Sequence, residues 1–353
     1  MQQDRCSVTR HIDQLSKLIH NAVAAPFRPW IESAMNDTTP NLPVRPHWEP
    51  VRHTVFQDAT LAQRIHDDGF AVVRLWSDRQ LTALQSVCNR EHRLQPADGG
   101  MFYSVYSQDL AYRRRVHDEI AAIMRPTLDE HFVDYRNVVN MFVVKAPGPA
   151  SEFGLHQDTT ALDEFRYSPL SIWSPLCDVS ADNGALCLVP RSHRFFSPYR
   201  GVSFPFPFSA IQDTIREYLV PLPMQRGEAL IFDNRLLHSS LPNRSRHNRD
   251  AIVSGIFPAQ ATFQVCFKQP GQSDAPIEIF EQAADWLLDY PNFLQNCHER
   301  PVAGTVIGHA QFEFPPMSDT EFRELCAAHG VHAVHSMPEP AKQRCNMIPE
   351  PVC

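Results

Sequence analysis

The stretch Leu155-His156-Gln157-Asp158 places an imidazole and a carboxylate two residues apart in an apolar, strand-like context. Side chains at positions i and i+2 of a β-strand point to the same face of a sheet. His156 and Asp158 could therefore reach one metal ion together, while Gln157 would point the other way. A His-x-Asp pair on its own more often lies at a surface or caps a helix, so a metal site requires further ligands elsewhere in the chain.

The candidate for a third ligand is His238. It lies beyond the far end of a turn and a buried, strand-like run at residues 226–232. Two imidazoles and one carboxylate on one side of a metal, with the opposite side open, are typical of non-heme Fe(II) oxygenases. Arg249 comes eleven residues after His238, with Ser240 between them. A guanidinium binds a carboxylate through two hydrogen bonds and a hydroxyl can add a third, which suits the distal carboxylate of 2-oxoglutarate.

Composition narrows the class of protein. The chain has 353 residues, 43% of them hydrophobic and 20% charged, which is typical of a soluble globular protein with a substantial core. A net charge of −8 without a basic cluster argues against nucleic-acid binding. The nine cysteines include no CxxC pair, which argues against a zinc ribbon or disulfide framework and favours the cytoplasm. We expect neither a signal peptide nor a membrane span.

Short β-like segments separated by turn residues predict a mainly β fold with helices, built on a double-stranded β-helix of the jelly-roll, cupin-like kind. We expect an N-terminal arm at residues 1–50 and the β-helix domain at 51–260, with helices packed outside it. A lid insert is expected at 195–226, and a C-terminal extension packed on the same domain at 261–353. Within that extension we expect helices near 278–288 and 319–329. The expected strands are 138–144, 155–158, 170–176, 185–189, 229–232 and 252–257.

The chain resembles the phytanoyl-CoA dioxygenase family of Fe(II)/2-oxoglutarate oxygenases. The resemblance covers roughly residues 68–258 and rests on motifs in the family's order: the strand at 68–73, His156-Gln157-Asp158, Trp173, the turn segment 184–194, His238 and Arg249. One departure is Arg191, where the family usually has glycine in its Pro-Gly-Ser-His turn.

The resemblance implies that His156, Asp158 and His238 bind Fe(II) and form the catalytic centre. Arg249 and Ser240 would then anchor the cosubstrate 2-oxoglutarate, and Asn140 and Trp173 would also contact it. Further candidates, for contacts to the substrate, are Lys145, Gln157, Phe102, Phe204 and Phe206.

The implied reaction uses O2 and 2-oxoglutarate to hydroxylate an aliphatic C–H bond of a small organic substrate in specialised metabolism, releasing succinate and CO2. Asp158 argues against halogenation, because halogenases of this superfamily replace the carboxylate with a small residue. Desaturation, cyclisation or epimerisation at the same iron site remains an alternative, as does a cupin-like metal-binding or sensing protein without turnover. The expected partners are small molecules, not nucleic acid or membrane, and a homodimer is left open.

Overall fold

The computed structural model describes residues 51–52, 54–91, 100–195, 197–272, 274–290 and 297–334. The expected N-terminal arm and the last residues of the C-terminal extension lie outside these ranges. Within them, no helix is both long and apolar enough to cross a membrane.

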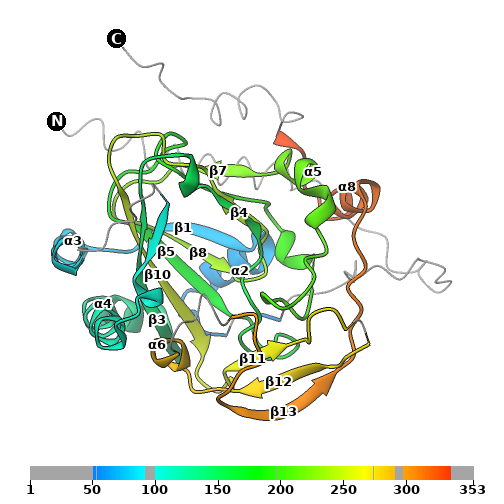
Figure 1. Cartoon of the computed structure of the whole chain (residues 1–353). Helices are drawn as coiled ribbons and strands as arrows, with labels where there is room; N and C mark the ends of the chain where they lie inside the picture. The colour runs from blue at the N-terminus through cyan, green and yellow to red at the C-terminus, as the bar shows by residue number, and fades with distance from the viewer. Residues whose placement is uncertain are drawn as a thin grey trace.

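Two antiparallel sheets face each other and form the centre of the molecule (Figure 1). The larger contains, in spatial order, β1 (Phe70–Arg74), β8 (Glu228–Asp233), β5 (Leu170–Pro175), β10 (Arg249–Pro258), β3 (Tyr135–Lys145) and β2 (Met101–Tyr103). The smaller contains β4 (Phe153–His156), β9 (His238–Ser240), β6 (Leu186–Leu188) and β7 (Val220–Leu222). From β3 to β10 the chain passes repeatedly from one sheet to the other, and only β6 and β7 follow each other within a sheet. This connection pattern is the expected double-stranded β-helix.

Alternation along β5 explains how the larger sheet is covered on both faces. Leu170 and Ile172 face the helices, whereas Trp173 faces the smaller sheet and packs in the core between the two sheets, where Leu188 of β6 also lies. A strand buried on both faces is nearly continuous in hydrophobic residues, and all six residues of β5 are buried.

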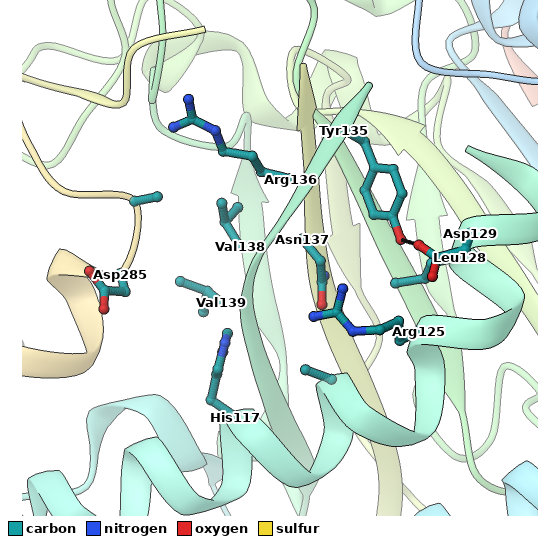
Figure 2. A pocket seen from close by; sticks show the side chains of 12 residues that line it. His117, Arg125, Leu128, Asp129, Tyr135, Arg136, Asn137, Val138, Val139 and Asp285 are labelled. Carbon is teal, nitrogen blue, oxygen red and sulfur yellow. Dashed lines mark hydrogen bonds between the residues drawn. The ribbon is translucent and has the colours of Figure 1, made fainter. Parts of the chain in front are cut away.

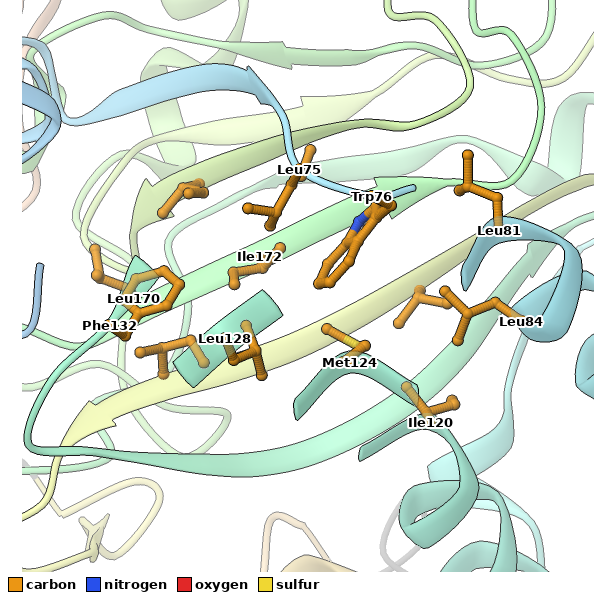
Figure 3. Packing of buried hydrophobic residues seen from close by; sticks show 14 of the residues in the cluster. Leu75, Trp76, Leu81, Leu84, Ile120, Met124, Leu128, Phe132, Leu170 and Ile172 are labelled. Carbon is orange, nitrogen blue, oxygen red and sulfur yellow. The ribbon is translucent and has the colours of Figure 1, made fainter. Parts of the chain in front are cut away.

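Helices α2 (Ala59–Asp68), α3 (Asp78–Glu91) and α4 (Leu110–His131) cover the outer face of the larger sheet. Leu81 and Leu84 of α3 and Met124 of α4 belong to the same buried cluster as Ile172 of β5, as Figure 3 shows. The start of α2 is fixed by the side chain of Asp58, which accepts hydrogen bonds from the first backbone N–H groups of the helix.

A third sheet follows the β-helix and comprises β11 (Gln264–Phe267), β12 (Ile277–Glu281) and β13 (Thr305–Ala310). The helix expected near 278–288 is therefore wrong: its first part is β12, and only the short α6 (Trp286–Asp289) is helical. Ile277-Glu278-Ile279 alternates apolar and acidic residues, and this period of two is the strand signal that decides the structure.

The C-terminal helix α8 (Asp319–Ala328) confirms the helix expected near 319–329 and packs against the insert that carries α5 (Gln212–Arg216). Phe322 of α8 is fully buried, and its ring lies 6.3 Å from Phe208 and 5.4 Å from Tyr218. The insert expected at 195–226 is thus held partly by residues of the C-terminal extension.

Candidate metal centre and active site

Three potential metal ligands meet at the end of β4 and the start of β9. His156, the last residue of β4, lies directly opposite His238, the first residue of β9. The Nε2 atoms of His156 and His238 lie 3.7 Å and 3.9 Å from Oδ1 of Asp158. One ligand atom from each of the three residues lies within 4.8 Å of the other two. The expected triad is therefore assembled in space.

The backbone fixes the tautomer of both imidazoles. Nδ1 of His156 lies 2.9 Å from the carbonyl oxygen of Gly154, and Nδ1 of His238 lies 2.9 Å from that of Leu236. A carbonyl oxygen can only accept, so Nδ1 carries the proton in each ring and the lone pair of Nε2 faces the centre. Burial, with a contribution from the neighbouring His238, holds the pKa of His156 below its ordinary value. In this tautomer each imidazole presents Nε2 as the atom that can bind a metal.

Local backbone structure, rather than a shared strand face, brings Asp158 to the two histidines. The pairing of β4 with β9 is irregular between Phe153 and His156, and the strand ends at His156. Asp158 therefore lies beyond the strand expected at 155–158. Its backbone N–H donates to the carbonyl of Asn234 at 2.9 Å, and its Oδ2 accepts from Ser171 Oγ at 3.3 Å. These contacts orient the third ligand.

Arg249, the first residue of β10, is only 1% exposed. Its Nε and Nη1 atoms are buried and have no hydrogen-bond partner among the described residues. Its guanidinium carbon lies 4.9 Å from the ring centre of Trp173, so the structure brings these two predicted cofactor contacts together. Burial lowers the pKa of Arg249 to about 10, which leaves the side chain charged at neutral pH. A buried cation with unused donors suits a carboxylate, and the triad suits Fe(II), so the residues present fit both Fe(II) and 2-oxoglutarate.

Lys145 and Ser240 meet at the end of the β-helix that carries Arg249. Lys145 pairs directly with Arg249 across β3 and β10. Its Nζ donates to Ser240 Oγ at 2.7 Å, to the carbonyl of Ser151 at 2.7 Å and to the carbonyl of Leu241 at 2.5 Å. All three N–H groups of the ammonium are therefore used within the protein. This arrangement leaves no donor of Lys145 for the direct substrate contact expected from the sequence.

Asn140 lies on the outer face of the larger sheet, away from the triad. Its backbone N–H donates to Nδ1 of His117 in α4 at 2.9 Å, and its side chain bonds to Asn137 and Ser254. A cavity of about 390 Å³ opens on this outer face, where His117, Asn137 and Val139 lie together (Figure 2). The predicted cofactor contact of Asn140 is therefore wrong, because its side chain is on the helix side of the strand.

Phe102 is also on the helix side, where it packs against the main core. It pairs with Val144, whereas Met101 pairs with Lys145, whose side chain reaches the inner face. The predicted substrate contact of Phe102 is wrong for the same reason: the next residue, Tyr103, has the opposite orientation in the strand.

The other predicted substrate contacts have partners within the protein. Gln157 is 7% exposed, and its Nε2 donates to the carbonyl of Arg235 at 2.5 Å. The ring of Phe204 lies 5.5 Å from Phe314, and that of Phe206 lies 5.4 Å from Phe208. Roles for these residues in binding substrate stay predictions.

An aromatic wall, composed of Phe153, Tyr103 and Tyr106, borders the triad and was not identified from the sequence. The ring of Phe153 meets His156 edge-on at 4.6 Å and is 39% exposed. Tyr103 lies 6.1 Å from Phe153 and 5.3 Å from Tyr106. Burial, and to a lesser extent the charge of Asp158, raises the pKa of both tyrosines, so both are neutral at physiological pH. The alternation of β2 could have identified Tyr103.

A second cavity, of about 90 Å³, begins beside Asp158 at Thr159 and Thr160. Much of its remaining lining comes from the C-terminal extension and includes Phe263, Trp286 and Tyr290. This cavity therefore brings Thr159, the residue after Asp158 in the chain, together with residues outside the resemblance to the oxygenase family.

Comparison with known proteins agrees with this site. The phytanoyl-CoA dioxygenase (PhyH) family model matches residues 65–251, just over half of the chain, and this range includes the triad and Arg249. The phytanoyl-CoA dioxygenase domain-containing protein 1 of Danio rerio is 28% identical over 135 residues, which are 35% of this chain and 45% of that protein. The dioxygenase trt7 of Aspergillus terreus is 27% identical over 165 residues, 45% of this chain and 52% of that protein. The chain thus spans about half the length of the curated relatives it matches.

Among solved structures, EctD from S. alaskensis aligns with a TM-score of 0.45 and 19% identity, over 64% of this chain and 86% of that one. The α-ketoglutarate-dependent carbocyclase SnoK from nogalamycin biosynthesis aligns with a TM-score of 0.42 and 20% identity, over 58% and 86% of the two chains. From the family match and the assembled triad, the chain belongs to the phytanoyl-CoA dioxygenase (PhyH) family of Fe(II)/2-oxoglutarate-dependent oxygenases.

Proposed function

We propose that this protein is a dioxygenase that hydroxylates an aliphatic C–H bond of a small organic substrate in specialised metabolism, with release of succinate and CO2. The observation that carries the proposal is the buried guanidinium of Arg249, two of whose nitrogen atoms have no partner among the described residues. A protein that only binds or senses a metal has no need of a buried, unpaired cation in the same β-helix. Burying such a charge costs several kcal/mol unless an anion joins it, so the site is built for an anionic cosubstrate.

The residues divide the work between binding the metal, binding the cosubstrate and supporting a metal ligand. His156, Asp158 and His238 would hold Fe(II), and such a ligand set leaves positions for 2-oxoglutarate and O2. When bound, Fe(II) with 2-oxoglutarate and O2 supplies the oxidation of the C–H bond. Arg249 binds the distal carboxylate of the cosubstrate through its two free donors. The aromatic wall supports His156 on one side, where the ring of Phe153 packs edge-on against the imidazole.

The chemistry of the aromatic wall and of the cavity at Thr159 favours a substrate without phosphate groups. Phe263, Trp286 and Tyr290 line the cavity together with the carboxylate of Glu299, and Arg200 is the one cationic side chain among its described lining residues. The guanidinium of Arg200 bonds to both carboxylate oxygens of the buried Glu164. It also donates to the backbone carbonyl of Asp158. Among the described residues that line this cavity, none offers a free cation for the phosphates of a CoA ester.

The test begins without oxygen. Purified protein with Fe(II) and 2-oxoglutarate should develop a weak visible charge-transfer band under anaerobic conditions, and admitting O2 should release succinate. A folded protein that gives neither the band nor succinate would overturn the proposal in favour of a protein without turnover.

With a substrate in hand, mass spectrometry separates the possible outcomes. Hydroxylation adds one oxygen atom, desaturation or cyclisation removes two hydrogens, and epimerisation leaves the mass unchanged. A product without added oxygen would refute hydroxylation while keeping the cofactor assignment.

A further inference from the structure

We propose that Lys145 is a positioning residue for the cosubstrate: its ammonium fixes the hydroxyl of Ser240 so that this hydroxyl donates to the carboxylate bound by Arg249. The inference rests on the proposed function and goes beyond it, because it assigns the selection of a dicarboxylic keto acid to a side chain that does not itself touch the ligand.

The geometry around Lys145 makes its ammonium a tie between the two sheets. Lys145 is fully buried at the end of β3 in the larger sheet, and it donates to Ser240 of β9 in the smaller sheet. Its other two donors are used by the carbonyls of Ser151 and Leu241. In its ammonium form Lys145 has three donors and no acceptor, so in that form the direction of the contact with Ser240 is fixed: Lys145 donates and the hydroxyl oxygen accepts.

The consequence concerns the proton of Ser240. This residue is 3% exposed, and its oxygen is occupied as an acceptor. A hydroxyl still has one proton to donate, and the described part of the chain shows no acceptor for it. Buried donors are rarely left unsatisfied in proteins, so a ligand acceptor is the partner that completes this site. The carboxylate expected at Arg249 is that acceptor.

The charges favour the same ligand. Lys145 pairs directly with Arg249 across β3 and β10, so two buried cations are neighbours. Burial and then Arg249 lower the pKa of Lys145 to about 7, while Cys187 of β6 and Glu152 raise it to a lesser extent. Adjacent like charges in a buried site are unfavourable until an anion binds. A second carboxylate on the keto acid would relieve this repulsion.

Gly184 keeps the stem of Lys145 in place. This glycine, in the Asn183-Gly184 turn, has a φ of +90°, and a Cβ atom on it would lie 2.5 Å from Cδ of Lys145. The aliphatic part of the lysine thus packs directly on the turn backbone. Loss of a purely structural tie would lower stability without changing the preference between keto acids, and the experiment separates these two effects.

The experiment compares two keto acids that share the metal-chelating end. Anaerobic protein with Fe(II) is titrated with 2-oxoglutarate and with 2-oxopentanoate, which has the same chain length but no distal carboxylate. Lys145→Met should weaken 2-oxoglutarate binding about ten- to a hundredfold, the contribution of a hydrogen bond to a charged group, and leave 2-oxopentanoate binding unchanged. Equal weakening of both keto acids, or of neither, would overturn the proposal.

Ser240→Ala is the second variant, and it keeps the test valid if Lys145→Met does not fold. It should lower the preference for 2-oxoglutarate by a similar factor, and an unchanged preference would also overturn the proposal. If both single variants fold, the double variant should be no worse than the weaker binder, because both changes remove the same hydrogen bond. Wild-type protein that binds neither keto acid would instead refute the proposed function.

Discussion

Replacing Arg249 by Met should have opposite effects on cosubstrate binding and on stability. The side chain has two unpaired buried donors, Nε and Nη1. Hydrogen bonds to charged groups contribute about 1.5–3 kcal/mol each, so losing two should cost about 3–6 kcal/mol of binding free energy. The Kd for 2-oxoglutarate should then rise by a factor of about a hundred to ten thousand.

The cosubstrate-free protein should be no less stable than wild type. Burial lowers the pKa of Arg249 from 12.5 to about 10, which corresponds to a cost on the order of 3 kcal/mol for keeping the charge at neutral pH. Met removes this cost and also the cation–π contact with Trp173, which contributes about 0.5–2 kcal/mol. The free energy of unfolding should therefore rise by about 1–2.5 kcal/mol.

Two measurements on the same preparations check this prediction: anaerobic titration of the Fe(II) protein with 2-oxoglutarate, and denaturant unfolding without it. Arg136→Met is the matched control, because Arg136 is an exposed arginine of β3 on the side of the 390 Å³ cavity. A Kd within about threefold of wild type would refute the role of Arg249 as anchor. A large loss of stability would refute the view that its charge is unpaired.

Four further outcomes are expected. Asp158→Ala removes one of three metal ligands and should weaken Fe(II) binding at least about a hundredfold in metal titrations; unchanged affinity would exclude this carboxylate as a ligand. The pKa of Lys145 lies at about 7, below its ordinary value, so this side chain loses its charge as the pH rises above about 7. The affinity for 2-oxoglutarate should then fall, while the cosubstrate-free protein becomes more stable. Lys145→Met should abolish both trends, and their persistence would assign them to another group. Gly184→Ala places a Cβ 2.5 Å from Cδ of Lys145 at a φ of +90° and should lower the free energy of unfolding, measured with denaturant, by about 2–4 kcal/mol. An unchanged free energy would contradict the close packing of the lysine stem. Phe322→Ala should cost about 3–5 kcal/mol, because this ring is fully buried between α8 and the insert, and unchanged unfolding would mean that the C-terminal helix does not stabilise the domain.

The ligand residues could be predicted from the sequence because their chemistry is specific, although the geometric reason was incomplete. Spacing of two along a strand indicated His156 and Asp158 correctly, yet Asp158 lies after the strand has ended. The irregular pairing of β4 and the contact of Asp158 with Asn234 place the carboxylate instead. Neither depends on a pattern that can be read without knowing which backbone lies opposite.

The orientation of residues along β3 was harder to predict, although part of it follows from alternation. Asn140 and Lys145 are separated by five positions, so side chains that alternate along a strand cannot both face the iron. What the sequence does not reveal is the bulge at Val139, a β-branched residue with a φ of +40°. Val138 pairs with Gly255 and Asn140 pairs with Ser254, which leaves Val139 as the extra residue. The contact of Lys145 with Ser240 marks the inner face, and the contact of Asn140 with His117 of α4 marks the outer one.

The departure at Arg191 shows how the part of the chain outside the family match is joined to the part inside it. The turn places Arg191 at a φ of +65°, the left-handed region that glycine adopts without strain and that costs another residue about 1–2 kcal/mol. Its guanidinium bonds to Asp68 at the end of α2 and to the carbonyl oxygen of His329 just after α8, each at 3.2 Å. Glycine could make neither contact. The arginine thus offsets backbone strain by linking the turn to the C-terminal extension, which also lines the cavity beside Asp158.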